Sequence, residues 1–288
     1  MVTASVMNIL SVQSSVAFGH VGNSAAVFPL QRLGFEVWPV NTVAFSNHPG
    51  YGAWRGRICD AELVAELLAG IAERGVLVSC AAVLSGYLGT VETGVAVLDA
   101  VTEVRKANPD ALYCCDPVIG DRDGGVYVRS GIAAFFRDHA LAKADIAAPN
   151  QFELEQLTER GVGSLAEALA AVDALRRIGP RIVLVTSLET SGRRDVSEML
   201  VVEDDAAWLV TTPLLPIAIN GAGDAVAALF LGHYLLTRNA EQALAATAAA
   251  IFAIIEATCR AGTRELQLVG AQEAFVAPRR HFATRRVR

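Results

Sequence analysis

Short apolar runs alternate along the chain with segments of helical periodicity, and polar stretches rich in glycine separate them. Six apolar runs have the length and composition of strands: 8–12, 35–43, 81–84, 112–115, 144–147 and 181–185. Helical character marks six further segments: 24–33, 60–74, 91–107, 151–160, 165–178 and 225–236. Two runs at 199–202 and 208–211 predict neighbouring strands that pair with each other. The repeated order of strand, loop and helix predicts an α/β fold, with a mostly parallel sheet and helices on both faces.

Length and composition favour one domain over residues 1–288, because the chain contains no linker, repeat or low-complexity block. A hydrophobic content of 53% can fill a sizeable core. Residues 1–7 are expected to form an N-terminal extension, and residues 279–288 a basic, solvated C-terminal tail. The run 243–257 is too short, and too mixed in polarity, for a membrane span.

The net charge of −6 argues against a general nucleic-acid binder, which needs a basic face to neutralise phosphates. The five cysteines contain no Cys-x-x-Cys pair, which indicates reduced thiols rather than disulfides or a zinc site. We therefore expect a soluble, cytoplasmic protein with a small-molecule partner and no membrane or nucleic-acid partner.

The stretch Asn220-Gly221-Ala222-Gly223-Asp224 precedes the most apolar predicted helix. Two glycines allow a tight turn, and the N–H groups of the following helical turn favour an anion such as a phosphoryl group. Asp224 stands where it could accept the proton of an attacking substrate hydroxyl. The alternative is that Asp224 is an N-cap and the glycines only shape a loop.

Polar residues follow several predicted strands, at the edge where ligands of parallel α/β sheets bind. Asp116 comes directly after the strand 112–115, and Asp121 lies in a loop whose oxygens suit Mg²⁺. Glu153 opens a helix and could organise a hydrated metal ion, while Thr186 and Ser187 offer hydroxyls to nucleotide phosphates. Solvated turns and an ordinary helix start explain the same residues equally well.

Several common site types are missing from the sequence. It contains no Gly-x-x-x-x-Gly-Lys-Ser/Thr loop, which excludes a P-loop enzyme. It also contains no Gly-x-Gly-x-x-Gly after the first strand, which removes the main support for a dinucleotide dehydrogenase. The five histidines lack metal-ligand spacing, although His20 and His48 lie in candidate site loops. The loop 45–52 is too rich in turn formers to be a helix or strand, and carries either a binding site or a plain surface connection.

Seven motifs together resemble the pyridoxal kinases of the ribokinase-like superfamily, over a region from about Asn8 to near Pro278. They are Gln13-Ser14, Gly19-His20-Val21-Gly22-Asn23-Ser24-Ala25-Ala26, Val37-Trp38-Pro39-Val40-Asn41-Thr42-Val43, Phe45-Ser46-Asn47-His48, Leu84-Ser85-Gly86-Tyr87-Leu88-Gly89, Cys115-Asp116-Pro117-Val118 and Ala148-Pro149-Asn150-Gln151-Phe152-Glu153. The resemblance implies ATP-dependent phosphorylation of the 5′-hydroxymethyl group of pyridoxal by a homodimer. It also implies Mg²⁺ as cofactor and often a monovalent cation.

The resemblance also implies roles for individual residues. Ser14 resembles the residue that hydrogen-bonds the pyridine ring, and Tyr87 the aromatic residue that closes over it. Asp224 matches the catalytic base and 221–223 the anion hole. The positions that match contacts with phosphates, metal, ATP or a monovalent ion are Asp116, Asp121, Ala148, Glu153, Thr186 and Ser187.

The chain departs from many relatives at positions that bear on binding. Ser15 stands where they have His, and Pro49 where they have Thr. Since Pro49 has no N–H and no hydroxyl, any ring contact made there must be lost or pass to Gly50. Ala148 offers no side-chain oxygen, so the resemblance does not extend a potassium requirement to this chain.

Two other functions agree with the same residues. A hydroxymethylpyrimidine kinase would also phosphorylate a hydroxymethyl group on a flat nitrogen ring. A carrier or sensor of pyridoxal 5′-phosphate could use the same fold without catalysis.

Overall fold

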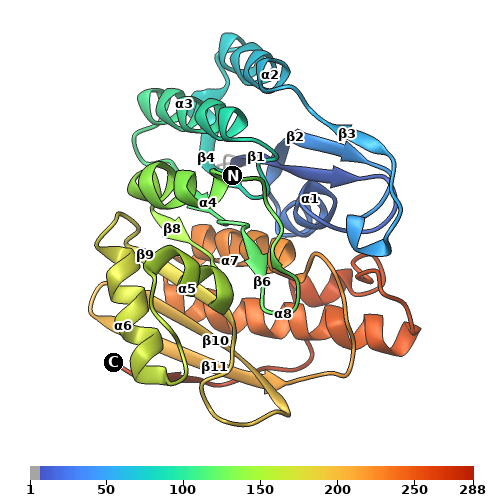
Figure 1. Cartoon of the computed structure of the whole chain (residues 1–288), viewed down its shortest axis with the longest axis vertical. Coiled ribbons are helices and arrows are strands. Elements are labelled where there is room, and N and C mark those ends of the chain that lie inside the picture. Colours follow the sequence, from blue (N-terminus) through green and yellow to red (C-terminus); the bar gives the residue numbers. More distant parts are fainter. Residues whose placement is uncertain (1–6) are drawn as a thin grey trace, which may run out of the picture.

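A ten-stranded sheet forms the centre of the computed structural model, which describes residues 7–288 (Figure 1). The strands are β1 (Asn8–Val16), β2 (Glu36–Phe45), β3 (Gly56–Ile58), β4 (Cys80–Ser85), β5 (Leu112–Cys115), β8 (Ile146–Ala147), β9 (Ile182–Leu188), β10 (Val196–Glu203), β11 (Ala206–Pro213) and β12 (Thr284–Arg286). Their spatial order is β12-β11-β10-β9-β8-β5-β4-β1-β2-β3. All pairs from β9 to β2 are parallel, and antiparallel strands extend both ends. The predicted mostly parallel sheet is therefore confirmed.

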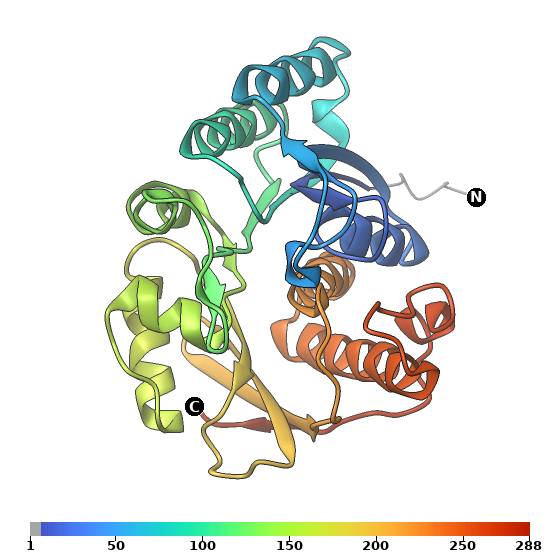
Figure 2. The ribbon, with the colours of Figure 1, turned by 45° about the vertical axis from the view of Figure 1, so that its right-hand side comes forward.

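Helices cover both faces of this sheet, as predicted. They are α1 (Asn23–Arg32), α2 (Ala61–Glu73), α3 (Val91–Ala107), α4 (Ile132–Phe135), α5 (Gln151–Thr158), α6 (Leu165–Arg176), α7 (Ala222–Thr237) and α8 (Ala240–Ala261). Apolar side chains of α2 to α6 pack on one face, and those of α1, α7 and α8 on the other. Figure 2 shows α1 lying against α7, with α8 beyond it.

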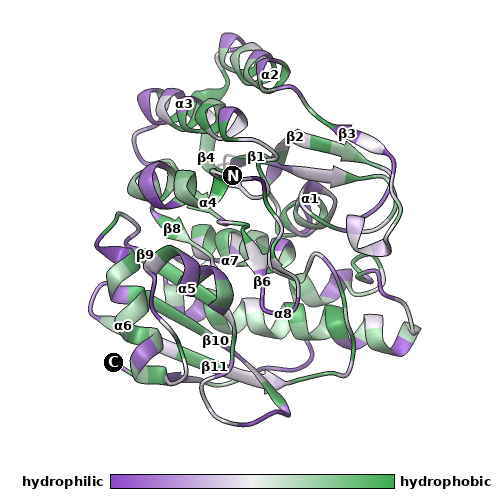
Figure 3. Cartoon of the chain, viewed as in Figure 1, coloured by the Kyte–Doolittle hydropathy of each residue, from purple (hydrophilic) through white to green (hydrophobic). Residues whose placement is uncertain are grey.

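Alternation along β1 shows why the sheet needs two helical layers. Leu10 and Val12 join the core beneath α2 to α6, whereas Ile9 joins the core beneath α1, α7 and α8. Successive side chains of a strand point to opposite faces, so a strand buried on both faces reads as a continuous apolar run. Figure 3 shows the same pattern: apolar residues dominate the strands, and polar residues gather on the outer turns of α2 and α3.

Helix α8 is longer than the apolar run that the sequence suggested, and its 22 residues are apolar enough to cross a membrane by composition alone. Of the window that passes this test, 56% is buried inside the molecule. The buried residues pack against α7 and the sheet strands. Its composition is therefore explained by its position in the core.

Several predicted boundaries are wrong. The segment 13–16 belongs to β1 rather than to a loop, because β2 pairs with it as far as Val16. Thr186 and Ser187 lie within β9, not after it. The loop 45–52 contains a 3₁₀ turn, Pro49–Tyr51, and the unpredicted edge strand β3 follows it. The glycine-rich loop 120–125 forms a small hairpin of β6 (Gly120–Asp121) and β7 (Gly125–Val126).

The C-terminal residues do not form the solvated tail that their charge suggested. Strand β12 pairs with β11 through Trp208, Leu209 and Val210. The Arg288 guanidinium then donates two hydrogen bonds to the Asp173 carboxylate of α6, at 2.8 and 2.9 Å. Backbone pairing and this ion pair anchor the chain end to the sheet. Of the predicted N-terminal extension, residues 1–6 lie outside the described part of the chain.

Candidate active site

The polar residues singled out in the sequence come together at the carboxyl edge of the parallel strands. Ser14 is on β1, Tyr87 follows β4, Asp116 follows β5, Ala148 follows β8, and Thr186 lies near the end of β9. The amino end of α7 supplies Asp224 at the same edge, beside the loop that follows β1. Parallel strands bring their ends to one edge whatever their separation in sequence.

The glycine turn before α7 has a backbone that requires glycine. Gly221 is the N-cap of the helix, with φ 78° and ψ 3°. A Cβ atom at Gly221 would lie 1.8 Å from the carbonyl oxygen of His20. Gly223 is exposed, and the N–H groups of this first turn have no partner within the helix. The turn thus presents a positive, unpaired backbone surface, as an anion hole requires.

Asp224 is the third residue of α7, so the alternative that it serves as the N-cap is wrong. Burial raises the pKa of Asp224 above its ordinary value, although the N–H groups of Gly22 and of Asp224 itself act in the opposite direction. Asp224 as a residue is partly exposed to solvent. A carboxylate of raised pKa has the character of a proton acceptor.

Two more carboxyl groups lie near Asp224. Burial, followed by the negative charges of Glu153 and Asp224, raises the pKa of Asp116 well above its usual range. Burial likewise raises the pKa of Glu153 to about 7, with Asp224 adding to the shift and three backbone N–H groups opposing it. Asp116 is 5% exposed and Glu153 is 3% exposed. The three groups thus form a carboxylate cluster at the strand ends.

Glu153 is tied to two loops through both of its oxygens. Oε1 accepts the Ile119 N–H at 2.9 Å, and Oε2 accepts the Asn150 N–H at 2.9 Å. The Asn150 amide oxygen accepts the Glu153 N–H in return, so the pair forms a capping box. Glu153 is therefore a helix-start residue, as the alternative reading of the sequence proposed. It is at the same time a member of the carboxylate cluster.

The cluster was tested for its fit to a divalent metal ion. None of the ion pairs formed by residues 7–288 involves Asp116, Glu153 or Asp224. No three His, Cys, Asp or Glu side chains in that range converge closely enough to bind a metal directly. The three carboxyl groups have no positively charged partner and do not converge on one point. They therefore fit a hydrated Mg²⁺ that is held partly by substrate phosphates.

Asp121, the other predicted metal ligand, lies apart from this buried cluster. It is exposed in the β6–β7 hairpin, where its carboxylate accepts the Gly124 N–H at 2.5 Å. Its charge still acts on Tyr127, whose pKa is raised by burial first and then by Glu153, Asp224, Asp116 and Asp121. Asp121 therefore faces the same space from the hairpin side.

Tyr127 lies beside the site without having been singled out in the sequence, and it is 52% exposed. It follows β7, and its backbone N–H donates to the Ile119 carbonyl at 3.1 Å. That bond closes the hairpin at Ile119, whose own N–H donates to the Glu153 carboxylate. The available signal was an aromatic residue directly after the glycine-rich loop 120–125.

Ser14 marks the side of the site nearest α1. Its residue is 9% exposed, and Gly22 packs directly against it. A Cβ atom at Gly22 would lie 2.3 Å from the Ser14 hydroxyl oxygen. Because the Gly22 N–H also reaches the Asp224 carboxylate, one backbone residue connects the predicted ring contact with the predicted base.

The loop that carries Pro49 and Gly50 has its own local order. The Gly50 N–H donates to His48 Nδ1 at 3.1 Å, so this N–H is already used within the turn. Burial lowers the pKa of His48. Gly50 is therefore not free to replace the contact that Pro49 lacks. Tyr87 is half-buried across the site, and its carbonyl accepts the Thr42 hydroxyl at 2.6 Å.

The residues expected near ATP border the ends of β8 and β9. Ala148 is buried, and its N–H donates to the Cys115 carbonyl at 3.0 Å. The Thr186 N–H donates to the Pro149 carbonyl at 3.0 Å, which places the two strand ends side by side. Ser187 is exposed and has φ 53°, an uncommon conformation for a residue other than glycine. Such strain is frequent at binding sites.

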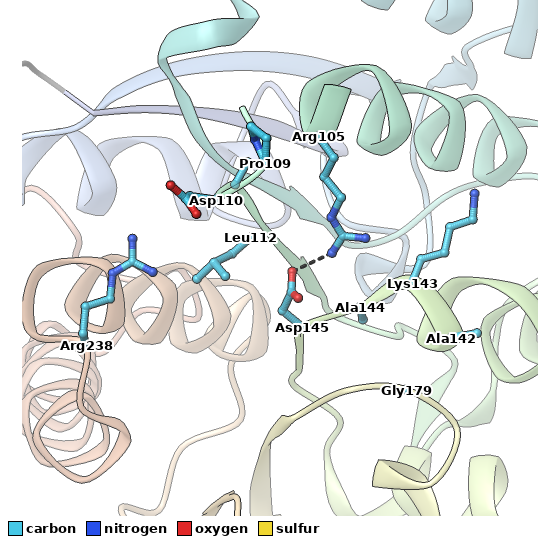
Figure 4. A pocket seen from close by; sticks show the side chains of 11 residues that line it. Arg105, Pro109, Asp110, Leu112, Ala142, Lys143, Ala144, Asp145, Gly179 and Arg238 are labelled. Atoms are coloured by element: carbon cyan, nitrogen blue, oxygen red, sulfur yellow. Dashed lines mark hydrogen bonds and ion pairs between the residues drawn. The ribbon is translucent and has the colours of Figure 1, made fainter. Parts of the chain in front are cut away.

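A separate pocket of about 690 Å³ lies near the amino ends of β5 and β8 (Figure 4). Its charged lining residues are Arg105, Asp110, Lys143, Asp145 and Arg238. Arg105 points at Asp145 and pairs with it at 2.6 Å. Asp145 also accepts the Tyr113 N–H at 2.7 Å. None of the predicted site residues lines this pocket, so it is distinct from the candidate active site.

Comparisons with known proteins agree with this arrangement. The family profile described as phosphomethylpyrimidine kinase matches residues 57–268. The chain is 59% identical over 283 residues to pyridoxal kinase PdxY of Rubrobacter xylanophilus, with 98% of each chain covered. It superimposes with a TM-score of 0.92 on pyridoxal kinase from Leishmania donovani in complex with ADP and ginkgotoxin, at 29% identity, covering 98% of this chain and 99% of the other. A complex of the Leishmania enzyme with ADP and pyridoxine gives a TM-score of 0.91, at 29% identity and the same coverage.

The match to the Rubrobacter relative extends over 98% of the chain. The matched region includes the glycine turn, the carboxylate cluster and the loop 45–52. The chain therefore belongs to the pyridoxal kinase family.

Proposed function

We propose that the chain transfers the γ-phosphoryl group of ATP to the 5′-hydroxymethyl oxygen of pyridoxal, yielding pyridoxal 5′-phosphate and ADP. The observation that carries this proposal is the position of Asp224 in the first turn of α7, directly after the glycine turn that packs against the His20 carbonyl. A base and an anion-binding backbone surface are the two parts that such a transfer requires.

The proposed reaction assigns one role to each part. The Asp224 carboxylate accepts the proton of the hydroxymethyl group as its oxygen forms a bond to the γ-phosphorus. The bond between that phosphorus and the bridging oxygen of ADP breaks at the same time. The N–H groups of residues 221–223 stabilise the negative charge on the transferring group, because the positive end of the helix dipole faces it.

The substrate ring occupies the space bordered by Ser14, Tyr87 and the turn Pro49–Tyr51 in this proposal. Ser14 hydrogen-bonds the ring, and Tyr87 covers one of its faces. Pro49 supplies only apolar contact, since its nitrogen carries no hydrogen. The Gly50 N–H stays with His48.

The nucleotide lies along the ends of β8 and β9, with Ala148, Thr186 and Ser187 beside it. Asp116, Asp121 and Glu153 are the residues that would hold Mg²⁺ through its water shell. The ion would supply positive charge to the β- and γ-phosphates of ATP. We extend the proposal to the Thr186 hydroxyl as the side-chain oxygen donor for any monovalent cation, because Ala148 has no side-chain oxygen.

The proposal includes a homodimer that works in the cytoplasm, as the family resemblance implies. Light scattering after size-exclusion chromatography should then give twice the chain mass of 30.4 kDa. A mass of one chain at micromolar concentration would contradict the dimer without affecting the catalytic assignment.

The test of function is direct. Purified protein with ATP, Mg²⁺ and pyridoxal should release ADP and form pyridoxal 5′-phosphate in equal amounts. Omission of pyridoxal is the control for slow ATP hydrolysis. A protein that binds pyridoxal 5′-phosphate but releases no ADP under these conditions is a carrier or sensor instead.

A second candidate, hydroxymethylpyrimidine kinase, is favoured by the family profile that matches residues 57–268. The same assay with hydroxymethylpyrimidine separates the two substrates. A higher kcat/KM for the pyrimidine than for pyridoxal would favour this candidate, because kcat/KM measures discrimination between substrates.

A further inference from the structure

A single carboxylate, that of Glu265 in the segment after α8, joins two loops that are distant in sequence. Glu265 Oε2 accepts the backbone N–H of His20 at 3.0 Å, in the segment after β1. Glu265 Oε1 accepts the phenolic hydroxyl of Tyr51 at 2.5 Å, in the loop after β2. The Arg264 guanidinium lies over the Tyr51 ring, 5.3 Å from its centroid. Both carboxylate oxygens are therefore used, each by a different loop.

The fit around Glu265 is tight on the side of the first loop. A Cβ atom at Gly19 would lie 2.2 Å from Glu265 Oε2, and Gly19 has φ 96°. Glycine at this position lets the backbone approach the carboxylate and turn within one residue. Glu265 itself is only partly exposed. The contact with the first loop is thus closely packed, whereas the Tyr51 hydrogen bond lies at the surface, with Tyr51 38% exposed.

Both loops held by Glu265 lead into the candidate active site. The first continues from His20 to Gly22, which packs against Ser14 and whose N–H lowers the pKa of the Asp224 carboxyl against the effect of burial. The His20 carbonyl also lies against Gly221 of the glycine turn. The second loop carries Pro49 and Gly50 in the turn that Tyr51 ends. The substrate side and the proton-accepting side of the site therefore share one anchor.

We propose that Glu265 is a positioning residue that fixes the vitamer-binding loop to the loop beside Asp224, so that ring and base are aligned. This inference rests on the proposed function. Tyr51 acts on the vitamer side of the junction and His20 on the catalytic side. ATP binds at the ends of β8 and β9, on other segments, so its binding is independent of the junction.

The geometry predicts different kinetic effects for the two partners. Tyr51→Phe removes the phenolic hydrogen bond and keeps the ring beneath Arg264, so the KM for pyridoxal should rise about three- to tenfold with kcat unchanged. Glu265→Ala releases both loops, so KM should rise and kcat should fall, each by about tenfold or more. Glu265→Gln keeps one acceptor oxygen, so its effects on KM and kcat should lie between those of Tyr51→Phe and Glu265→Ala. The KM for ATP should stay within about twofold in all three variants.

A double-mutant cycle tests the junction itself. Tyr51→Phe added to Glu265→Ala should cause no further loss in kcat/KM for pyridoxal, because the bond it removes is already gone. Glu273→Ala is the matched control: Glu273 pairs with Arg32 at 3.1 Å, has an 85% exposed side chain and lies outside the site. It should leave all parameters near those of the parent protein.

Hydrogen exchange separates this inference from the proposed function. Backbone amides in 18–22 and 46–52 should exchange about tenfold faster in Glu265→Ala than in Glu273→Ala, whether or not the protein turns over pyridoxal. A parent protein without kinase activity would overturn the proposed function alone. Unchanged exchange in both loops would overturn the role of Glu265. The role of Glu265 would also be overturned if Glu265→Ala lowered the melting temperature and raised the KM for pyridoxal and the KM for ATP equally. That result would show that Glu265 only stabilises the fold.

Discussion

Asn150 and Glu153 cap the start of α5 reciprocally, each accepting the other's backbone N–H at 2.9 Å. The remaining Glu153 oxygen holds the Ile119 N–H at 2.9 Å, in the segment between Asp116 and the β6–β7 hairpin. One carboxylate therefore starts a helix, positions the loop after β5 and contributes charge to the site. Its substitution should affect metal dependence and stability separately.

For metal dependence, Glu153→Gln should raise the Mg²⁺ concentration needed for half-maximal rate. The charge is lost while the volume and one acceptor oxygen remain. Titration of the rate with Mg²⁺ at saturating ATP and pyridoxal measures the effect. Glu155→Gln on the same helix is the control, because Glu155 bonds the Val162 N–H away from the cluster. Wild-type Mg²⁺ dependence in Glu153→Gln would leave Glu153 as a capping residue only.

For stability, the raised pKa of Glu153 fixes the sign of a pH effect. Its folded-state pKa is about 7 against an ordinary value of 4.5, so the folded protein binds the proton more tightly than the unfolded chain. The Glu153 contribution to the free energy of unfolding should fall as pH rises from about 4.5 to 7 and then level off. Between pH 5 and 8 the difference between wild type and Glu153→Gln should change by on the order of 2 kcal/mol, in favour of Gln at high pH. Denaturant unfolding without Mg²⁺ measures this difference, and an unchanged difference would contradict the shift.

Asp224→Asn tests the proposed base. Turnover should fall about 10²–10⁴-fold with little change in either KM, because the amide cannot accept the hydroxymethyl proton. Since burial raises the pKa of Asp224, the neutral variant should melt no lower than the parent at pH 8. Asp99→Asn, on an exposed position of α3, is the control. A stable Asp224→Asn protein with most of its kcat would defeat the assignment.

Ser14→Ala tests ring recognition. Loss of one neutral hydrogen bond should weaken pyridoxal binding by about 0.5–1.5 kcal/mol, which raises its KM roughly two- to tenfold. The KM for ATP should rise less. Ser79→Ala is the control, because Ser79 precedes β4 at the opposite edge of the sheet, where its hydroxyl accepts the Asn8 side-chain N–H at 2.6 Å. An unchanged pyridoxal KM would remove Ser14 from the site.

Deletion of residues 284–288 tests the C-terminal strand. The loss of β12 and of the Arg288–Asp173 ion pair should lower the free energy of unfolding by about 1–3 kcal/mol. Activity at room temperature should persist, because this edge of the sheet is far from the strand ends that form the site. Arg285→Ala, on an exposed side chain of the same strand, should leave stability nearly unchanged. A deletion variant that melts like the parent would show that the pairing contributes nothing.

Local patterns in the sequence determined most of the architecture. Continuous apolar runs marked strands buried on both faces, and helical periodicity marked the covering layers, because side-chain direction repeats every two or 3.6 residues. The same patterns located the strand ends, so Asp116, Ala148 and the glycine turn could be assigned to one edge of the sheet before any contact was known.

Edge pairing and chain ends were beyond these patterns. Strand β12 carries exposed arginines and joins the sheet through backbone hydrogen bonds, which no side-chain pattern reports. The polar segment 13–16 is a strand for the same reason: its backbone pairs with β2. Local polarity predicted a tail and a loop at these places because it reports burial of side chains, not pairing of backbones.

Only the tertiary structure decided how the site residues act on one another. The sequence named Asp116, Glu153 and Asp224 separately, but burial raises the pKa of all three, and the charge of neighbouring carboxylates raises the pKa of Asp116 and Glu153 further. Both effects depend on distances in space. Glu265 lies 214 residues from Tyr51 and 245 from His20, so no local motif could connect them. The chain folds locally by periodicity, whereas its chemistry depends on contacts that form only when the strand ends and the end of α8 meet.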